Sequence, residues 1–291
     1  MTDRAAPPPR LWTLVAAIFA LAVGTVALGP SVLTGYFLLS SRSILAGGLL
    51  PAQEQLTQFY DTLPGFLFAA TVAGGWTGLV ALVAGLLSPV PLPQRLGFLP
   101  SRLGRAGWWI VPLGALGLNQ AVDAAFHLTG FGRGDALEGL LKTLAGARGP
   151  TIAVAVLVVG ALSATCEELF FRGYLQRRLV LRFGPLVGVA VPALLFGLAH
   201  LDLHHALFAL TFGLFVGAAA WAADSTGPAI AAHVVNNTVS VVTLVLGLDP
   251  ATDSAGAQWS SLVVGGAVAA WALAWILRRA PRPVAAAEFV I

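Results

Sequence analysis

Long apolar stretches follow one another along almost the whole 291-residue chain. A helix that crosses a bilayer needs about 20 mostly apolar residues, because the hydrocarbon layer is roughly 30 Å thick and each helical residue rises about 1.5 Å. By this criterion we expect about eight transmembrane helices, near residues 11–39, 63–87, 107–127, 151–175, 184–201, 205–222, 227–247 and 260–278. The predicted fold class is all-α, a polytopic integral membrane helical bundle.

The composition agrees with this prediction. Hydrophobic residues make up 57% of the chain and charged residues only 10%, whereas a soluble domain carries roughly 25% charged residues. Sixteen basic and 13 acidic residues cannot cover the surface of a soluble protein of this size, so membrane lipid is the expected partner of that surface. The formal net charge of +3 is too small to suggest nucleic-acid binding, and the single cysteine, Cys166, excludes an internal disulfide.

The first apolar run has two interpretations. Arg4 and Arg10 precede it, as basic residues precede the apolar region of a signal peptide. The run is nevertheless longer than that apolar region needs to be, and further spans follow. We therefore expect a retained anchor behind a disordered tail at residues 1–10. No internal repeat or separate soluble domain is visible in the sequence.

Basic residues predict the orientation. Across eight crossings, the connections and tails on alternate sides contain 12 and 4 Lys or Arg residues. By the positive-inside rule both termini are expected in the cytoplasm, together with the segment that holds Arg172, Arg177, Arg178 and Arg182. We expect an integral multi-pass protein of a bacterial inner membrane.

Two adjacent carboxylates interrupt the fourth apolar run. Ionisable groups inside a span are costly unless they are paired or face a cavity, which makes Glu167 and Glu168 candidates for function. Glu168 and Arg172 are spaced i, i+4 with the acid first, the better order for an intrahelical ion pair. Glu167 points about 100° away and has no local partner. A purely structural ion-pair network is the alternative interpretation.

Two later spans also carry polar groups. The fifth ends in Phe196 and His200, and the seventh carries His233 and Asn237 on one helical face. A turn near residues 183–185, midway between Glu167 and His200, would bring those two to similar depth. Straight helices would nevertheless keep His200 and His233 apart, so a shared site requires tilted, broken or re-entrant segments.

These residues form three motifs in order: EExxxR at Glu167, Glu168 and Arg172, FxxxH at Phe196 and His200, and HxxxN at His233 and Asn237. With them the chain resembles the CPBP intramembrane proteases, the family of the type II CAAX prenyl endopeptidases and of ABI-like proteins. The resemblance divides the chain into three early helices at 11–149, a protease-like catalytic core at 150–247, and a last helix with a tail at 248–291.

The resemblance implies that Glu167 activates a water molecule, that His200 lies close to it, and that His233 and Asn237 stabilise the oxyanion. Supporting positions would be Glu168, Arg172, Phe196 and Asn236. A carboxylate base and polar donors are reasonable for peptide hydrolysis. We expect no obligatory metal cofactor, because the HExxH motif is absent. Zinc, if bound, would take Glu167, His200 and His233 as ligands.

The implied function is cleavage of a peptide bond in a membrane-associated protein or peptide. Two alternatives stay open. Some members of the family are linked to bacteriocin immunity, so the protein could be a non-catalytic membrane scaffold. In a proton-coupled transporter the same Glu and His side chains would form a relay, although such proteins usually show two symmetric halves.

Overall fold

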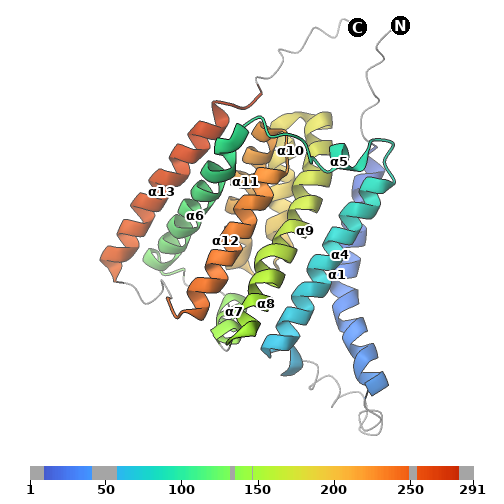
Figure 1. The fold of residues 1–291 in the computed structure, drawn as a ribbon, viewed down its shortest axis with the longest axis vertical. Coiled ribbons are helices and arrows are strands. Elements are labelled where there is room, and N and C mark those ends of the chain that lie inside the picture. The colour runs from blue at the N-terminus through green and yellow to red at the C-terminus, as the bar shows by residue number, and fades with distance from the viewer. Residues whose placement is uncertain (1–9, 41–57, 132–134, 146, 249–253, 282–291) are drawn as a thin grey trace, which may run out of the picture.

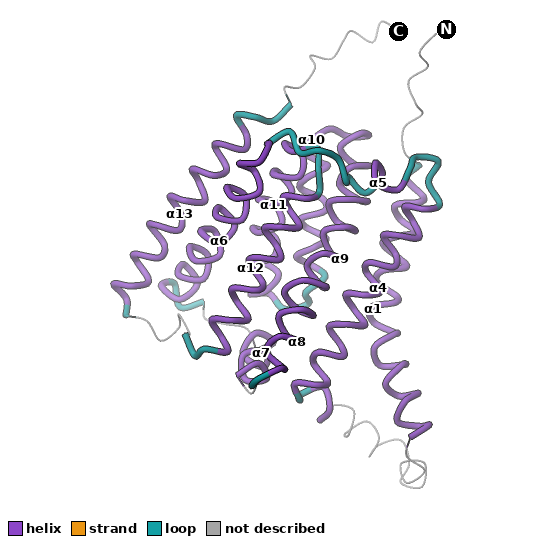
Figure 2. Tube along the Cα trace, viewed as in Figure 1, coloured by secondary structure: helices purple, strands orange, loops and turns teal. Residues whose placement is uncertain are grey.

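The computed structural model describes residues 10–40, 58–131, 135–145, 147–248 and 254–281. Within these ranges every regular element is a helix and none is a strand (Figure 2). The elements are α1 (Leu11–Ser40), α4 (Leu63–Leu86), α5 (Leu92–Arg95), α6 (Gly104–Leu128), α7 (Asp135–Ala145), α8 (Pro150–Ala155), η1 (Val156–Ser163), α9 (Ala164–Glu168), η2 (Leu169–Gln176), α10 (Arg177–Leu198), α11 (Leu203–Ala223), α12 (Gly227–Val245) and α13 (Ala255–Leu277).

The long helices lie side by side in one bundle (Figure 1). Six helical segments of the described chain are long and apolar enough to cross a membrane. The prediction of an all-α, multi-pass membrane bundle is therefore confirmed, with six such segments instead of about eight. Two features account for the difference. Residues 150–198 form one 49-residue helical run, and α6 is not among the six, since Asn119, Gln120 and Asp123 interrupt its apolar sequence.

The 49-residue run reverses direction at Gly184. This glycine has φ 81° and ψ 174°, a conformation that side chains with a Cβ rarely adopt, and Pro185 follows it. A Cβ on Gly188 would lie 2.8 Å from the Val180 Cα, so the chain folds back on itself within eight residues. The hairpin predicted near residues 183–185 is thus confirmed.

The arm of α10 after this turn is short. Residues 185–198 span only about 21 Å at 1.5 Å per residue, less than the roughly 30 Å hydrocarbon layer. The α10–α11 turn therefore lies inside the thickness of the bundle, where Asp202 caps α11 by accepting a hydrogen bond from the His205 backbone N–H at 2.8 Å. This short arm brings His200 to the depth of the other polar groups, which straight full-length spans would not do.

One end of the bundle gathers basic side chains. This end holds the start of α1, the helix α5, the start of α10 and the end of α13 (Figure 1). We call it the arginine-rich end, and its described basic residues are Arg10, Arg95, Arg102, Arg105, Arg177, Arg178, Arg182, Arg278 and Arg279. The start of α1 and the end of α13 thus lie at the same end of the bundle, and the expected cytoplasmic placement of the termini stays a prediction.

Candidate active site

The two adjacent glutamates lie where the helix is irregular. Glu167 and Glu168 end α9, a short α-helical piece between the π-helical stretches η1 and η2. Wider π-turns rotate the following side chains relative to a regular helix, and such turns are frequent at functional sites. Adjacent residues of a helix are about 100° apart, so the two carboxylates point in different directions and have different environments.

Glu168 is fully buried in an ion pair. Its Oε1 accepts a hydrogen bond from Arg172 Nη1 at 2.8 Å, and both side chains have no exposed surface. Arg172 Nη2 also donates to the Gly213 carbonyl at 3.1 Å, and the guanidinium lies 4.8 Å from the centre of the Phe196 ring. The intrahelical pair predicted from the i, i+4 spacing is confirmed. It is also attached to α11 and α10, so it organises three helices.

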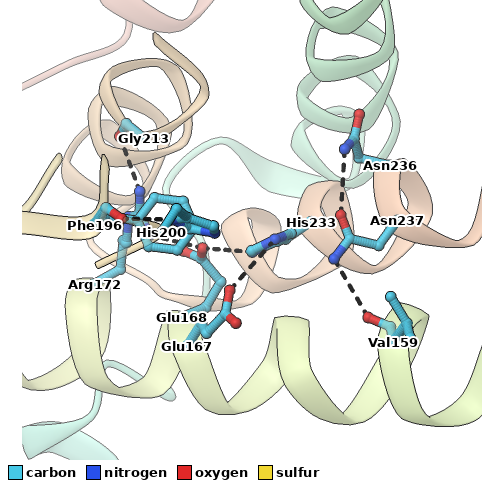
Figure 3. Close-up of polar contacts among 10 residues, drawn as sticks. All are labelled: Val159, Glu167, Glu168, Arg172, Phe196, His200, Gly213, His233, Asn236 and Asn237. Atoms are coloured by element: carbon cyan, nitrogen blue, oxygen red, sulfur yellow. Dashed lines mark hydrogen bonds and ion pairs between the residues drawn. The ribbon is translucent and has the colours of Figure 1, made fainter. Parts of the chain in front are cut away.

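His233 lies between the two glutamates (Figure 3). Its Nδ1 is 2.9 Å from Glu168 Oε1, and its Nε2 is 3.8 Å from Glu167 Oε2. Because a carboxylate accepts, Nδ1 carries the proton when the imidazole is neutral, and Nε2 then presents a lone pair toward Glu167. The distance to Glu167 is too long for a direct hydrogen bond. Glu167 keeps 26% of its side-chain surface exposed, in contrast to Glu168.

His200 faces the same region from the end of α10. Its Nδ1 donates to the Phe196 carbonyl at 2.8 Å, which leaves Nε2 as the acceptor in the neutral ring. The Phe196 ring contacts both imidazoles, with ring centres 5.0 Å from His200 and 5.8 Å from His233. Among the described residues no hydrogen bond or ion pair joins His200 to Glu167. The histidine whose ring nitrogen approaches the Glu167 carboxylate is His233.

The asparagines of α12 form a chain of amides. Asn119 Nδ2 donates to Asn236 Oδ1 at 2.9 Å, and Asn236 Nδ2 donates to Asn237 Oδ1 at 3.3 Å. Asn237 Nδ2 donates in turn to the Val159 carbonyl at 3.3 Å (Figure 3). One amide proton of Asn237 remains available. The sequence analysis missed Asn119, whose only signal was its place in the polar group Asn119, Gln120 and Asp123 within the apolar sequence of α6.

Except for the buried Glu168–Arg172 pair, these groups border one cavity of about 720 Å³. Its polar lining includes Glu167, His200, His233, Asn236 and Asn237, and most of its remaining surface comes from apolar and aromatic side chains of α1, α4, α6, α10, α11 and α12. An apolar cavity with a few converging polar groups is typical of a binding site for an extended or small ligand. The three motifs of the sequence therefore meet at one cavity.

Among the described residues, Glu167, His200 and His233 are not placed as a set of metal ligands. His233 presents Nε2 and Glu167 presents Oε2, but the described residues contain no group of three or more His, Cys, Asp or Glu side chains placed to hold a metal ion. Catalytic zinc normally takes three protein ligands and a water molecule. Glu167, His200 and His233 thus do not form a ready zinc site in this arrangement.

Residues 149–239 match the family model of the Rce1-like type II CAAX prenyl endopeptidases. The matched segment is less than half of the chain, and it contains both glutamates, Arg172, both histidines and Asn237. Neither a comparison with curated proteins nor one with solved structures finds a match. The family match therefore covers every catalytic candidate that lines the cavity, whereas α1, α4 and α6 add lining from outside the matched segment.

Proposed function

We propose that this protein, whose residues 149–239 match the Rce1-like family model, is an intramembrane endopeptidase that hydrolyses a peptide bond of a membrane-associated protein or peptide. The observation that carries the proposal is the opposition of Glu167 Oε2 and His233 Nε2 across 3.8 Å at the wall of an apolar cavity. Both atoms accept hydrogen bonds when His233 is neutral. A water molecule can satisfy both by donating one proton to each.

In the proposed reaction Glu167 is the general base. It takes a proton from the water as the water oxygen attacks the peptide carbonyl carbon, and it later returns that proton to the leaving amine. Its partial exposure to the cavity supports this role, and among the described residues no Lys or Arg side chain pairs with the Glu167 carboxylate. We propose no obligatory metal, because a carboxylate base can activate water without one.

His233 is proposed to orient this water. Glu168 holds its Nδ1 proton and Arg172 holds Glu168, so the direction of Nε2 is fixed by buried charge-assisted hydrogen bonds. In this arrangement Glu168 and Arg172 position the His233 ring and do not contact the substrate. The remaining amide proton of Asn237 is the donor that we assign to the oxyanion of the tetrahedral intermediate.

The cavity argues for catalysis over a non-catalytic scaffold. A scaffold does not need two hydrogen-bond acceptors, Glu167 Oε2 and His233 Nε2, that can bind the same water molecule. It also does not need the buried Glu168–Arg172 ion pair to orient His233. The transporter alternative is also less favoured, because the polar groups form one cluster at one cavity instead of two related halves.

Substrate trapping tests the proposal. Membranes from cells that express wild-type protein or Glu167→Gln are compared for the peptides and protein ends they contain. We expect a defined set of membrane peptides to accumulate in the variant, with the corresponding cleavage products present only with wild type. Glu138→Gln, a change in an exposed carboxylate of α7 that pairs with Lys142, is the matched control. Identical profiles for wild type and Glu167→Gln would contradict the proposal.

A further inference from the structure

A second, larger cavity of about 1110 Å³ lies at the arginine-rich end. It is bounded by α1, α4, α5 and the junction of η2 with α10, and none of the catalytic candidates lines it. Its walls are of two kinds. Arginines and hydroxyl groups line one part, and small or branched apolar side chains of α1 and α4 line the other.

Arg178 is the most buried cation of this cavity, with 6% of its surface exposed. Its Nη1 donates to Thr13 Oγ1 and to the Tyr174 hydroxyl, both at 2.6 Å. Its Nε is buried and has no hydrogen-bond partner. The described polar partners of this side chain are therefore neutral oxygens, and its guanidinium also lies 4.6 Å from the centre of the Tyr174 ring. One of its donors is unsatisfied, which is costly for a buried charge.

Arg95 adds a second cation. Its Nε donates to Ser88 Oγ at 2.7 Å, again a neutral acceptor. Partial burial lowers the pKa of Arg95, and the positive charges of Arg178 and Arg177 lower this pKa further. The guanidinium groups therefore repel one another across the cavity.

No described acid neutralises these two arginines. Asp224 is the carboxylate at this end, and it already pairs with Arg102 at 2.9 Å and with Arg177 at 3.1 Å. Among the described residues neither Arg95 nor Arg178 forms an ion pair with a carboxylate. An anion supplied from outside the protein would offset the repulsion and could satisfy the free donors.

The apolar wall indicates what kind of anion fits. Ala16 and Ala20 of α1 line the cavity with Leu79 and Val83 of α4, and the last two are 49% and 46% exposed within the apolar span Leu63–Leu86. The apolar wall therefore belongs to a face of α4 that we expect lipid to cover. A soluble anion would gain nothing from this wall, whereas an amphiphile would place its chain there.

We propose that this cavity binds an anionic phospholipid, with the headgroup phosphate at Arg95 and Arg178 and an acyl chain along α1 and α4. Basic pockets between transmembrane helices on the cytoplasmic side recognise anionic headgroups in this way. The site does not depend on the proposed peptidase activity, because it lies outside the catalytic cavity. Bound lipid would join α1 to α10, two helices that are distant in the sequence.

Native mass spectrometry of the full-length protein in detergent tests the proposal. The protein is incubated with equal amounts of phosphatidylglycerol and phosphatidylcholine, and the ratio of the two bound lipids is measured. We expect wild type to prefer phosphatidylglycerol. Arg95→Gln and, separately, Arg178→Gln should each lower that preference about fivefold, the effect of one basic residue near an anionic headgroup. Arg105→Gln, at an exposed arginine of the same end that does not line the cavity, should leave it unchanged.

Three outcomes would overturn the proposal. Wild type could show no preference, or Arg105→Gln could reduce the preference as much as Arg95→Gln does, in which case the attraction is a property of the whole basic end. Inorganic phosphate could displace phosphatidylglycerol at equal concentration, which would make the site one for soluble anions. Arg95→Gln keeps the test valid if Arg178→Gln fails to fold, because Arg95 is less buried than Arg178.

Discussion

The Glu167→Gln variant is expected to lose about 10²- to 10⁴-fold in kcat on the peptides identified by trapping, the usual contribution of a positioned general base. Glutamine keeps the size of the side chain but cannot take a proton from water. Folding should be unaffected, because the Glu167 carboxylate is partly exposed and its closest described approach to His233 is 3.8 Å, too long for a direct hydrogen bond. Initial rates with purified protein, together with a thermal melt in detergent, measure both quantities.

Two comparisons make this result specific. Glu138→Gln should retain the wild-type rate, since Glu138 lies in α7 and pairs with Lys142 away from the cavity. A rate within tenfold of wild type for Glu167→Gln would remove Glu167 from the chemistry. A loss of rate that accompanies an equally large drop in melting temperature would indicate a structural role instead.

The Arg172→Met variant is expected to have the largest effect on stability, about 3–5 kcal/mol in the free energy of unfolding. The change leaves the Glu168 carboxylate buried without its cation, and it also removes the hydrogen bond to the Gly213 carbonyl. Thermal and denaturant unfolding in detergent measure the loss. The double variant Glu168→Leu with Arg172→Met should recover part of it, because the unpaired buried charge is then gone.

Lys142→Met provides the matched control for this prediction. Lys142 and Glu138 are also spaced i, i+4, but their side chains are 81% and 53% exposed. An exposed helical pair of this kind contributes only about 0.3–0.5 kcal/mol. Equal losses for Arg172→Met and Lys142→Met would show that burial does not give the Glu168–Arg172 pair its importance.

Local spacing was enough to predict part of the site. The Glu168–Arg172 pair depends on neighbouring turns of one helix, and the hairpin at Gly184 depends on a local turn signal. Both interactions are set within a short stretch of chain. For this reason they could be inferred before the bundle was known.

The partner of Glu167 could not be predicted in this way. The resemblance implied that His200 would lie close to Glu167, and both side chains line one cavity. The sequence did not indicate the contact of Glu167 with His233 at 3.8 Å. Which histidine is adjacent depends on how α9 and α12 are rotated against each other, and the π-helical stretches around α9 change that rotation. A sequence pattern that assumes regular helices contains no information about this angle.

The amide chain was hidden for a related reason. Asn119 contacts Asn236 across 117 positions of sequence, and its neighbours in α6 give no sign of that contact. The number of membrane-spanning segments was affected as well. The criterion of about 20 apolar residues per span assumes straight and uniformly apolar helices. The short arm of α10 and the polar residues of α6 depart from that assumption, so the criterion gives a different number of spans.

The central claim is that Glu167 and His233 act on one water molecule, and a double-mutant cycle tests it most directly. His233→Asn is the appropriate partner change, because an asparagine amide can retain the donor toward Glu168 while the Nε2 acceptor is lost. Rates on a trapped peptide are measured for wild type, both single variants and the double variant. Residues that act as a unit are strongly non-additive, so we predict that the double variant is no slower than Glu167→Gln alone, within about threefold. Losses that multiply, with each change slowing the reaction independently, would contradict a shared water.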